Sequence, residues 1–455
     1  RLKIMLVCGE TDSWKESAVT FQAALQRRNI PCDLALVPDV GHSLKGLIAA
    51  QGTTAALFQD HIFREEAAWA DDPAIDECDD VVRDATNDAA VAVTESYYSE
   101  AEGRKQGYQV LLPPGYRATE SYPLFVQVFG GNDLLPTLER PFIRVRPSGR
   151  GVWGYRSMSR YDILQVIRRT KQAYHIDEDR VYITGTSAGA TGVMHAAAQR
   201  PDVFAAVIPL VAFGNDLPLG NFRNLPVRCE HGVNDWTSAI GNVRVQFQKL
   251  GKLQYDAVLN EHPTAGHGIR IPPAATMDWL FGIKRNSSPM NVVYSCEHPR
   301  DGRAYWLQID SFANPHQIAR IEAEVVSNKV TIATRNIQQF SIDLALAPFS
   351  GTQHLLIDDD AMEIDVTASQ GSATFVRSGT WQLVASENDL LPQRPYGAGA
   401  AGNLFQGEPL LVVYGTGGTP NENRFLQQAA DVLRRSGGPT YKTASVQFPV
   451  CADTS

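Results

Sequence analysis

The sequence has few cysteines, no excess of positive charge and no long apolar run. Its 455 residues include six cysteines, none of them in a CxxC pair, which argues against a zinc cluster. The formal net charge is −9, so the basic footprint of a nucleic-acid-binding protein is missing. No apolar stretch approaches the roughly 20 residues that a membrane-spanning helix needs. The hydrophobic content of 44% and the charged content of 20% are those of an ordinary globular protein.

The cysteines leave the redox compartment open. Three of them lie in or beside apolar strand-like runs and are expected to be buried free thiols, namely Cys8, Cys32 and Cys229. The spacing is still compatible with one or two disulfides, and a secreted or periplasmic location is slightly favoured. The chain starts at Arg1 rather than Met, and we expect it to be part of a longer polypeptide.

The strongest local motif is the pentapeptide Gly185-Thr186-Ser187-Ala188-Gly189. A strand-like run over 180–184 precedes it and a helix-like run over 190–200 follows. This is the Gly-x-Ser-x-Gly turn in which a strained backbone presents a serine hydroxyl beside a helix N-terminus. The setting predicts a nucleophile at Ser187, whereas the pentapeptide alone would also fit a plain strand–helix turn.

A nucleophilic serine needs a histidine to accept its proton and a carboxylate to hold that histidine. Asp235 and His267 each follow a strand-like run, at the edge where open α/β sheets place their active sites. Their separation of 32 positions fits one strand–helix–strand unit, and glycines flank His267. We predict Asp235 as the acid and His267 as the base. The alternatives are His231 and His262 for the base, and Glu230 and Asp256 for the acid.

Two backbone N–H groups are needed to hold the negative charge that develops on an attacked carbonyl oxygen. Ala188, directly after the serine, is predicted to supply one. The turn Gly130–Asn132 after the apolar run 123–129 is predicted to supply the other, from Gly131 or Asn132. The alternative is an ordinary Gly-Gly turn. Substrate contacts are predicted for Trp236 and for Arg150, although the basic loop around Arg150 also fits a structural turn.

These runs resemble the α/β-hydrolase superfamily, and within it the serine hydrolases that are polyhydroxybutyrate-depolymerase-like and feruloyl-esterase-like and are related to prolyl oligopeptidases. The resemblance covers roughly residues 90–283. It implies a doubly wound, mostly parallel α/β sheet with the order nucleophile, acid, base along the chain. The matching runs are 108–116, 122–131, 162–174, 177–189 and 201–209.

The rest of the chain predicts further segments. Residues 1–64 repeat the strand, Asp and His spacing of the second half of a hydrolase domain, with Asp12 and His42 in the places of Asp235 and His267. We interpret them as the tail of an upstream repeat, with a generic βαβ unit as the alternative. Residues 65–89 form an acidic linker, 90–284 the catalytic domain, 285–390 a small antiparallel β-sandwich-like domain, and 391–455 a Gly/Pro linker and a partial α/β unit.

Two further motifs invite over-interpretation. The run Asp358-Asp359-Asp360 lacks spaced ligands and is expected to be a solvated turn rather than a metal site. The loop 415–418 lacks the lysine of a P-loop, so a strand–helix connection is preferred to a phosphate site.

The sequence therefore predicts a serine esterase that acts on a small-molecule or polymer ester and needs no metal or organic cofactor. One alternative is a peptidase of the prolyl-oligopeptidase type, although no blade repeat precedes residue 90. Another is a non-catalytic glycan-binding or adhesion protein on a hydrolase scaffold.

Overall fold

The structure is a computed structural model, and it describes residues 4–9, 19, 22–23, 32–37, 90–99, 104–128, 141–147, 159–212, 217–270, 272–314, 317–366, 371–384, 412–414, 420–435 and 450–452. β1 and β2 belong to one compact unit, and the other strands and helices described below belong to a second. In the first unit, β1 (Ile4–Gly9) and β2 (Cys32–Val37) run parallel, in the places where the sequence predicts strands. Asp12 and His42 lie outside the described residues.

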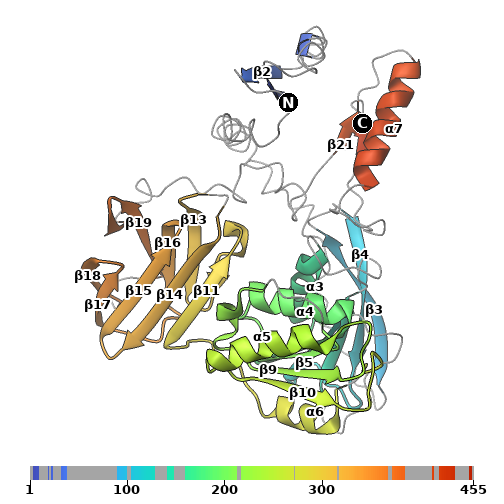
Figure 1. Ribbon diagram of the computed structural model, residues 1–455, viewed down its shortest axis with the longest axis vertical. Coiled ribbons are helices and arrows are strands. Elements are labelled where there is room, and N and C mark those ends of the chain that lie inside the picture. The colour runs from blue at the N-terminus through green and yellow to red at the C-terminus, as the bar shows by residue number, and fades with distance from the viewer. Residues whose placement is uncertain are drawn as a thin grey trace. The chain divides into compact units, whose positions relative to one another are not determined.

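The second unit contains an eight-stranded sheet (Figure 1). Its strand order is β3-β4-β6-β5-β7-β8-β9-β10. The pairs β3–β4 and β4–β6 are antiparallel, and the pairs from β6 to β10 are parallel. The strands are β3 (Val91–Ser99), β4 (Arg104–Leu112), β5 (Tyr122–Val128), β6 (Ile143–Pro147), β7 (Ile176–Thr186), β8 (Ala206–Leu210), β9 (Val227–Gly232) and β10 (Ala257–His262).

The side-chain pattern of each strand matches its place in this sheet. All seven residues of β5 and all five of β8 are buried, as expected for parallel strands covered on both faces. The described part of β3, at the edge, instead alternates between half-buried and exposed residues over 91–96. β3 and β4 form the antiparallel hairpin that the alternation in the sequence predicts.

Helices cover both faces of the sheet. α3 (Ser159–Ala173), α4 (Ala188–Gln199) and α5 (Ile240–Lys252) pack into one apolar core, whereas α6 (Ala274–Phe281) packs into a second core on the opposite face. Seven of the twelve residues of α4 are alanine or glycine and eleven are buried, so the helix packs closely between the sheet and α3. α5 buries one face and exposes the other, which is the behaviour of an amphipathic surface helix.

This is the α/β-hydrolase fold, and the fold class predicted from the sequence is confirmed. The chain passes from β5 to its neighbour β6 on one side, and then crosses over β5 to form β7 on the other side. The connection from β5 to β6 and the connection from β7 to β8 therefore run in opposite directions along the sheet. The carboxyl ends of β5 and β7 therefore flank the switch point at which open α/β sheets bind their ligands. The turn containing Ser187 follows β7, and the predicted oxyanion turn follows β5.

Two five-stranded sheets follow in the chain and share one apolar core. We call the two sheets together the sandwich. The orders are β11-β14-β15-β17-β18 and β12-β13-β16-β19-β20. All pairs are antiparallel except β15–β17, which is parallel, so the first sheet is mixed rather than purely antiparallel. The strands are β11 (Asn291–Cys296), β12 (Arg303–Ala304), β13 (Leu307–Phe312), β14 (Ala319–Val326), β15 (Lys329–Arg335), β16 (Ile337–Asp343), β17 (Thr352–Ile357), β18 (Asp360–Asp365), β19 (Ser372–Ser378) and β20 (Thr380–Leu383).

Buried hydrogen bonds join the sandwich to the eight-stranded sheet and its helices. Asn221, on the short helix η3 (Leu219–Phe222), donates its amide to Ser295 O at 2.8 Å and accepts from Ser295 N at 2.8 Å. Asp301, on η4 (Pro299–Asp301), accepts from Tyr161 Oη at 3.1 Å and from Gln199 Nε2 at 2.5 Å. These contacts pair polar groups that would otherwise lie buried without partners.

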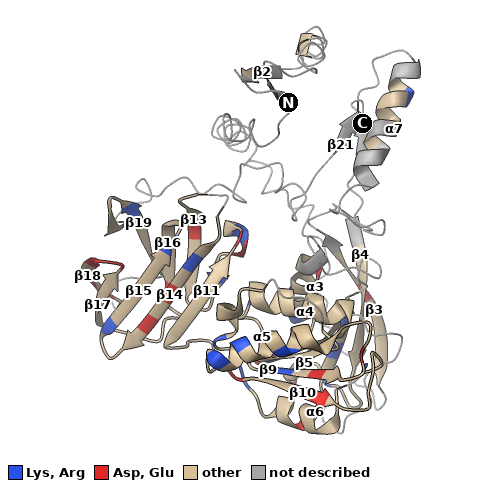
Figure 2. Cartoon of the chain, in the orientation of Figure 1, with Lys and Arg blue, Asp and Glu red and all other residues tan. Residues whose placement is uncertain are grey.

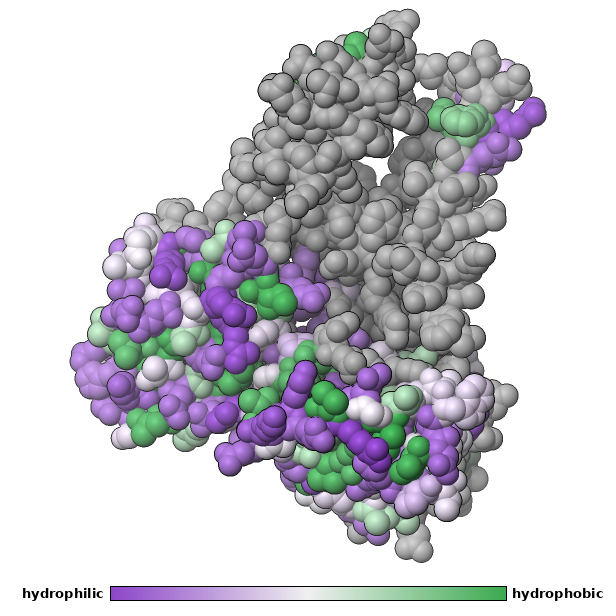
Figure 3. All heavy atoms as spheres, viewed as in Figure 1, coloured by the Kyte–Doolittle hydropathy of each residue, from purple (hydrophilic) through white to green (hydrophobic). Residues whose placement is uncertain are grey.

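The surface of the described residues is mixed. Basic and acidic residues are interspersed along the strands and helices (Figure 2), and hydrophilic and hydrophobic residues alternate over the face seen in Figure 3. No helix among the described residues is long and apolar enough to cross a membrane. Near the end of the chain, β21 (Val412–Tyr414) and β22 (Val450–Ala452) run parallel, and α7 (Pro420–Arg435) contacts both.

Candidate active site

Ser187 occupies a strained turn between β7 and α4. Its backbone has φ 58° and ψ −118°, and a positive φ is rare for a residue with a side chain. Ser187 N donates to Leu210 O at 2.9 Å, and Thr191 N donates to Ser187 O at 3.1 Å. The turn is therefore fixed at one side by the neighbouring strand β8 and at the other by the first turn of α4. Such over-determined strain is typical of functional residues.

Gly185 shows why the turn needs small residues. A Cβ at this position would lie 2.6 Å from Val128 O on β5 and 2.8 Å from both C and O of Gly189. All three are backbone atoms and cannot move cheaply. The glycines of the pentapeptide therefore let β7 and the start of α4 approach each other, as the sequence motif predicts.

The structure brings Ser187, His267 and Asp235 into one hydrogen-bonded row. His267 Nε2 lies 2.8 Å from Ser187 Oγ, and His267 Nδ1 lies 2.8 Å from Asp235 Oδ2. A carboxylate can only accept, so the proton of the neutral imidazole belongs on Nδ1. Nε2 is then free to accept the Ser187 hydroxyl proton. This arrangement is the one that a histidine general base requires.

Asp235 is held rigidly from its other oxygen. Oδ1 accepts from Thr237 N at 2.9 Å and from Ser238 N at 2.8 Å, and the carboxylate side chain is fully buried. Its Oδ2 also lies 3.5 Å from His231 Nε2, whose nearest hydrogen-bond acceptor is Ser238 O at 2.9 Å. His231, an alternative base in the sequence, thus lies beside the acid and against the turn that holds it.

The loop that carries His267 crosses β9 at very close range. A Cβ at Gly232 would lie only 2.4 Å from both Ala265 O and Gly266 O. Asn234 N donates to Ala265 O at 3.0 Å, which holds the loop against the turn before Asp235. The glycine at the end of β9 therefore permits the approach that brings His267 over the sheet edge.

The other predicted site residues lie in different surroundings. Ala188, at the first position of α4, is buried, and its N–H belongs to the unpaired first turn of the helix. Trp236, next to Asp235, is 89% exposed and so leaves a large aromatic surface at the rim of the site. Gly131, Asn132 and Arg150 lie outside the described residues.

Sequence reasoning missed the role of Glu230 in the structure. From the sequence, Glu230 is only an alternative acid to Asp235. It is 1% exposed, and its Oε2 lies 2.6 Å from Nε2 of His262. Two of the four alternatives to Asp235 and His267 are thus partners of each other. An acidic residue in the middle of a buried strand was the signal that a partner must exist.

Cys229 does not compete as a nucleophile. It is a buried free thiol, as expected, and burial raises its pKa well above the ordinary value. It therefore remains protonated at neutral pH.

Asp358, from the acidic run, has a structural role. Its carboxylate accepts from Thr334 N at 2.7 Å and from Trp381 Nε1 at 2.9 Å. Among the described residues, no group of three or more His, Cys, Asp or Glu side chains is arranged to hold a metal ion.

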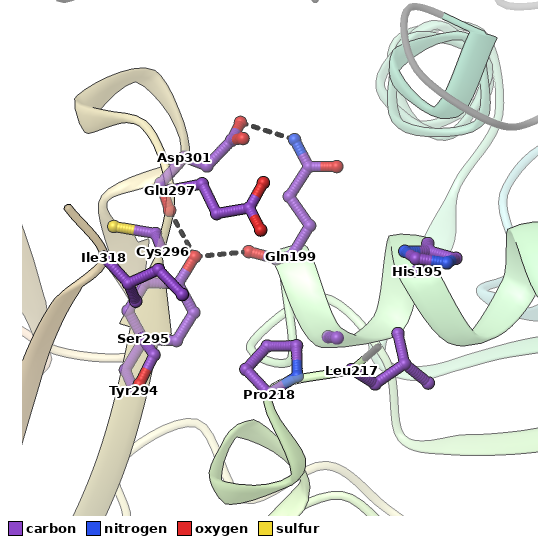
Figure 4. Close-up of a pocket in the computed structure, with 11 residues that line it drawn as sticks. His195, Gln199, Leu217, Pro218, Tyr294, Ser295, Cys296, Glu297, Asp301 and Ile318 are labelled. Carbon is purple, nitrogen blue, oxygen red and sulfur yellow. Dashed lines mark hydrogen bonds between the residues drawn. The ribbon is translucent and has the colours of Figure 1, made fainter. Parts of the chain in front are cut away.

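A separate cavity of about 340 Å³ lies where α4 meets the sandwich (Figure 4). α4 begins beside Ser187 and ends at Gln199, which lines the cavity, so roughly 16 Å of helix separates the two places at 1.5 Å per residue. The cavity therefore does not form part of the Ser187 site. Its lining consists of His195, Ala198, Gln199, Leu217, Pro218, Tyr294, Ser295, Cys296, Glu297, Asp301 and Ile318.

The comparisons with known proteins fall on the eight-stranded sheet. Residues 146–218, which include the Ser187 turn, match the profile of the prolyl oligopeptidase family. No curated protein sequence matches the chain. The predicted resemblance to α/β-hydrolase serine hydrolases is confirmed by this match and by the strand order.

Solved structures with a similar arrangement are distant. A thermostable esterase aligns at 22% identity and a TM-score of 0.39, over 43% of this chain and 63% of its own. A putative dipeptidyl aminopeptidase IV from Bacteroides ovatus aligns at 13% identity and 0.36, over 43% of this chain and 35% of its own. A ferulic acid esterase from the anaerobic fungus Anaeromyces mucronatus aligns at 16% and 0.34, over 40% and 85%. The chain spans less than two thirds of the first two.

Proposed function

We propose that this hydrolase-fold chain is a serine esterase that cleaves carboxylic esters through Ser187, His267 and Asp235. The observation that carries the proposal is the pair of 2.8 Å contacts that His267 makes, one to Ser187 Oγ and one to Asp235 Oδ2. Nucleophile, base and orienting acid thus lie within hydrogen-bond reach in the order that the chemistry requires.

Acylation begins when Ser187 Oγ attacks the ester carbonyl carbon and its proton passes to His267 Nε2. The proposed donors to the oxygen that becomes negative are the Ala188 N–H, at the start of α4, and the predicted donor of Gly131 or Asn132. Asp235 stabilises the imidazolium, because its buried carboxylate accepts from Nδ1. The intermediate then collapses: the carbon–oxygen bond to the alcohol breaks, and the alkoxide leaves with the proton from Nε2.

Deacylation repeats the sequence with water. His267 Nε2 removes a proton from a water molecule, which attacks the acyl carbon of the Ser187 ester. Collapse of the second intermediate returns the proton to Ser187 Oγ and releases the carboxylic acid. The two steps need no group beyond these side chains and the oxyanion donors.

The exposed Trp236 supports a substrate with an apolar or planar part. Its ring is 89% exposed directly after Asp235, which is unusual for a large aromatic side chain. A ring in this place can cover one face of a bound acyl or alcohol group. Arg150 remains a predicted contact for an anionic substrate group.

The test is active-site labelling combined with an ester panel. Wild type is expected to react with a fluorophosphonate probe and to hydrolyse p-nitrophenyl acyl esters, whereas Ser187→Ala should lose both. Ser372→Ala, at an exposed serine of the sandwich, is the matched control and should behave as wild type. Labelling of Ser187→Ala at the wild-type rate would refute the proposal. Absence of labelling in the wild type would favour a non-catalytic, glycan-binding or adhesion role.

A peptidase is the second candidate, because the matching profile is that of the prolyl oligopeptidase family. The same three side chains can cleave an amide, so the distinction lies in the substrate pocket. Hydrolysis of Xaa-Pro amides without hydrolysis of the acyl esters would select the peptidase. The converse result would select the esterase.

A further inference from the structure

Glu230 forms a buried hub next to the proposed site. Its carboxylate, on β9, accepts from three side chains: Asn260 Nδ2 at 2.8 Å, Thr276 Oγ1 at 2.5 Å and His262 Nε2 at 2.6 Å. Only 1% of the glutamate is exposed. Oε1 accepts the hydrogen bonds of Asn260 and Thr276, and Oε2 accepts that of His262. A buried carboxylate with this many donors is satisfied rather than stranded.

The donors come from the two ends of the segment that carries His267. His262 is the last residue of β10 and lies five positions before His267. Thr276 lies in the first turn of α6, nine positions after His267. One carboxylate thus fixes both the departure of the chain from the sheet and its return. The same strand β9 continues into the turn that holds Asp235, five residues after Glu230.

Other bonds to this segment lie on the side toward Asp235. Val233 N donates to His262 O at 3.0 Å, and Asn234 binds the carbonyl oxygens of both Pro263 and Ala265 at 3.0 Å. They hold the part of the loop that precedes His267. Thr276 is the contact through which Glu230 also reaches the part that follows it.

We propose that Glu230 is a positioning residue that sets where the imidazole of His267 stands relative to Ser187. The inference rests on the proposed function, because it concerns the same reaction. Glu230 touches neither Ser187 nor His267 in the described contacts; it acts through the two ends of the loop. A shift of about 1 Å in a reacting group can lower a rate about 100-fold. The position of this loop should therefore affect kcat.

Three substitutions at two positions separate positioning from folding. Glu230→Gln keeps the size of the side chain but replaces one accepting oxygen with an amide that cannot accept. Thr276→Val removes the hydroxyl while keeping the shape, and Thr276→Ser restores the hydroxyl. The matched control is Glu363→Gln, because Glu363 forms a solvent-exposed pair with His354 at 2.9 Å on the sandwich. That pair has the same chemistry without burial.

The measurements are kcat, KM and the rate of fluorophosphonate labelling, taken well below the melting temperature of each variant. Glu230→Gln should lower kcat and the labelling rate together, by roughly 10- to 100-fold, with KM changed less than twofold. Thr276→Val should lose about 3- to 10-fold, and Thr276→Ser should recover most of it. Glu363→Gln should match wild type.

A spectroscopic readout makes the test independent of turnover. The Nδ1 proton of His267, hydrogen-bonded to Asp235, should give a downfield proton resonance in wild type and Glu363→Gln. It should broaden or shift in Glu230→Gln. Variants that melt earlier yet keep wild-type kcat, labelling rate and resonance would overturn the inference and leave the proposed function intact. Failure of wild type to label would instead overturn the proposed function, while the resonance would still report on Glu230.

Discussion

Replacing Gly232 with alanine should disable the site without removing any reacting group. The new Cβ would lie 2.4 Å from Ala265 O and from Gly266 O, and 2.7 Å from Ala265 C. All three are backbone atoms, and real contacts of this kind stay beyond 3.0 Å. Both carbonyl groups must therefore retreat from β9 by more than half an ångström. They immediately precede His267 in the chain, so the imidazole moves with them.

The size of the effect follows from the site geometry. The His267–Ser187 contact of 2.8 Å would lengthen beyond good hydrogen-bond range if the loop withdrew by this amount. A misplacement approaching 1 Å predicts a fall in kcat of about 10- to 100-fold. Because Asn234 N also binds Ala265 O, a smaller loss of thermal stability should accompany it.

The assay is steady-state ester hydrolysis, with the fold checked by circular dichroism and a melting curve. Gly251→Ala is the control, since a Cβ there meets nothing within 4 Å. It lies near the end of α5, where alanine is favoured over glycine by up to about 1 kcal/mol, so this variant should keep full activity and melt no earlier than wild type. If Gly232→Ala retained kcat within twofold of Gly251→Ala, the argument that the close approach positions His267 would be wrong.

Two further predictions address the acid and the sandwich. Asp235→Asn should lower kcat about 10⁴-fold in a folded protein, because the amide favours the wrong imidazole tautomer; a loss below tenfold would contradict the role of the carboxylate. Asp310→Asn should raise the melting temperature at pH 7. Burial raises the pKa of Asp310, whose carboxyl group also accepts from Ser341 Oγ. Above the unfolded-state pKa of about 3.9, the folded protein therefore loses stability, because the buried carboxyl group resists ionisation more than the unfolded one does. The gain, roughly 2–4 °C per kcal/mol, should vanish toward pH 3, and a pH-independent difference between the melting curves would count against this cause.

The sequence predicted those features that depend on a short stretch of chain. The turn at Ser187 needs glycines at fixed positions, since Gly185 has no room for a Cβ, and that requirement is legible in five residues. Burial of all seven residues of β5 likewise follows from a continuous apolar run. A doubly wound, mostly parallel sheet could therefore be expected from the sequence.

Other features depend on how distant segments meet. Alternation along β15 and β17 gives the buried face of a strand but not its direction, because the period of two is the same in both, so the parallel pair was not foreseen. The partners of Glu230 come from β10 and α6, and only the sheet register places them together. Local reasoning therefore left Glu230 and His262 as alternatives for the roles that we propose for Asp235 and His267.

The amide of Asn221 has a consequence for anyone who wishes to shorten this protein. Its side chain bonds to the main chain of Ser295 as a neighbouring strand would: it donates a hydrogen bond to Ser295 O and accepts one from Ser295 N. A fragment ending near residue 284, the natural place to cut by sequence, would strip Asn221 of that partner and Gln199 of Asp301. Each lost hydrogen bond removes about 0.5–1.5 kcal/mol of net stabilisation. A fragment that keeps these contacts has to include β11 and η4, which supply Ser295 and Asp301.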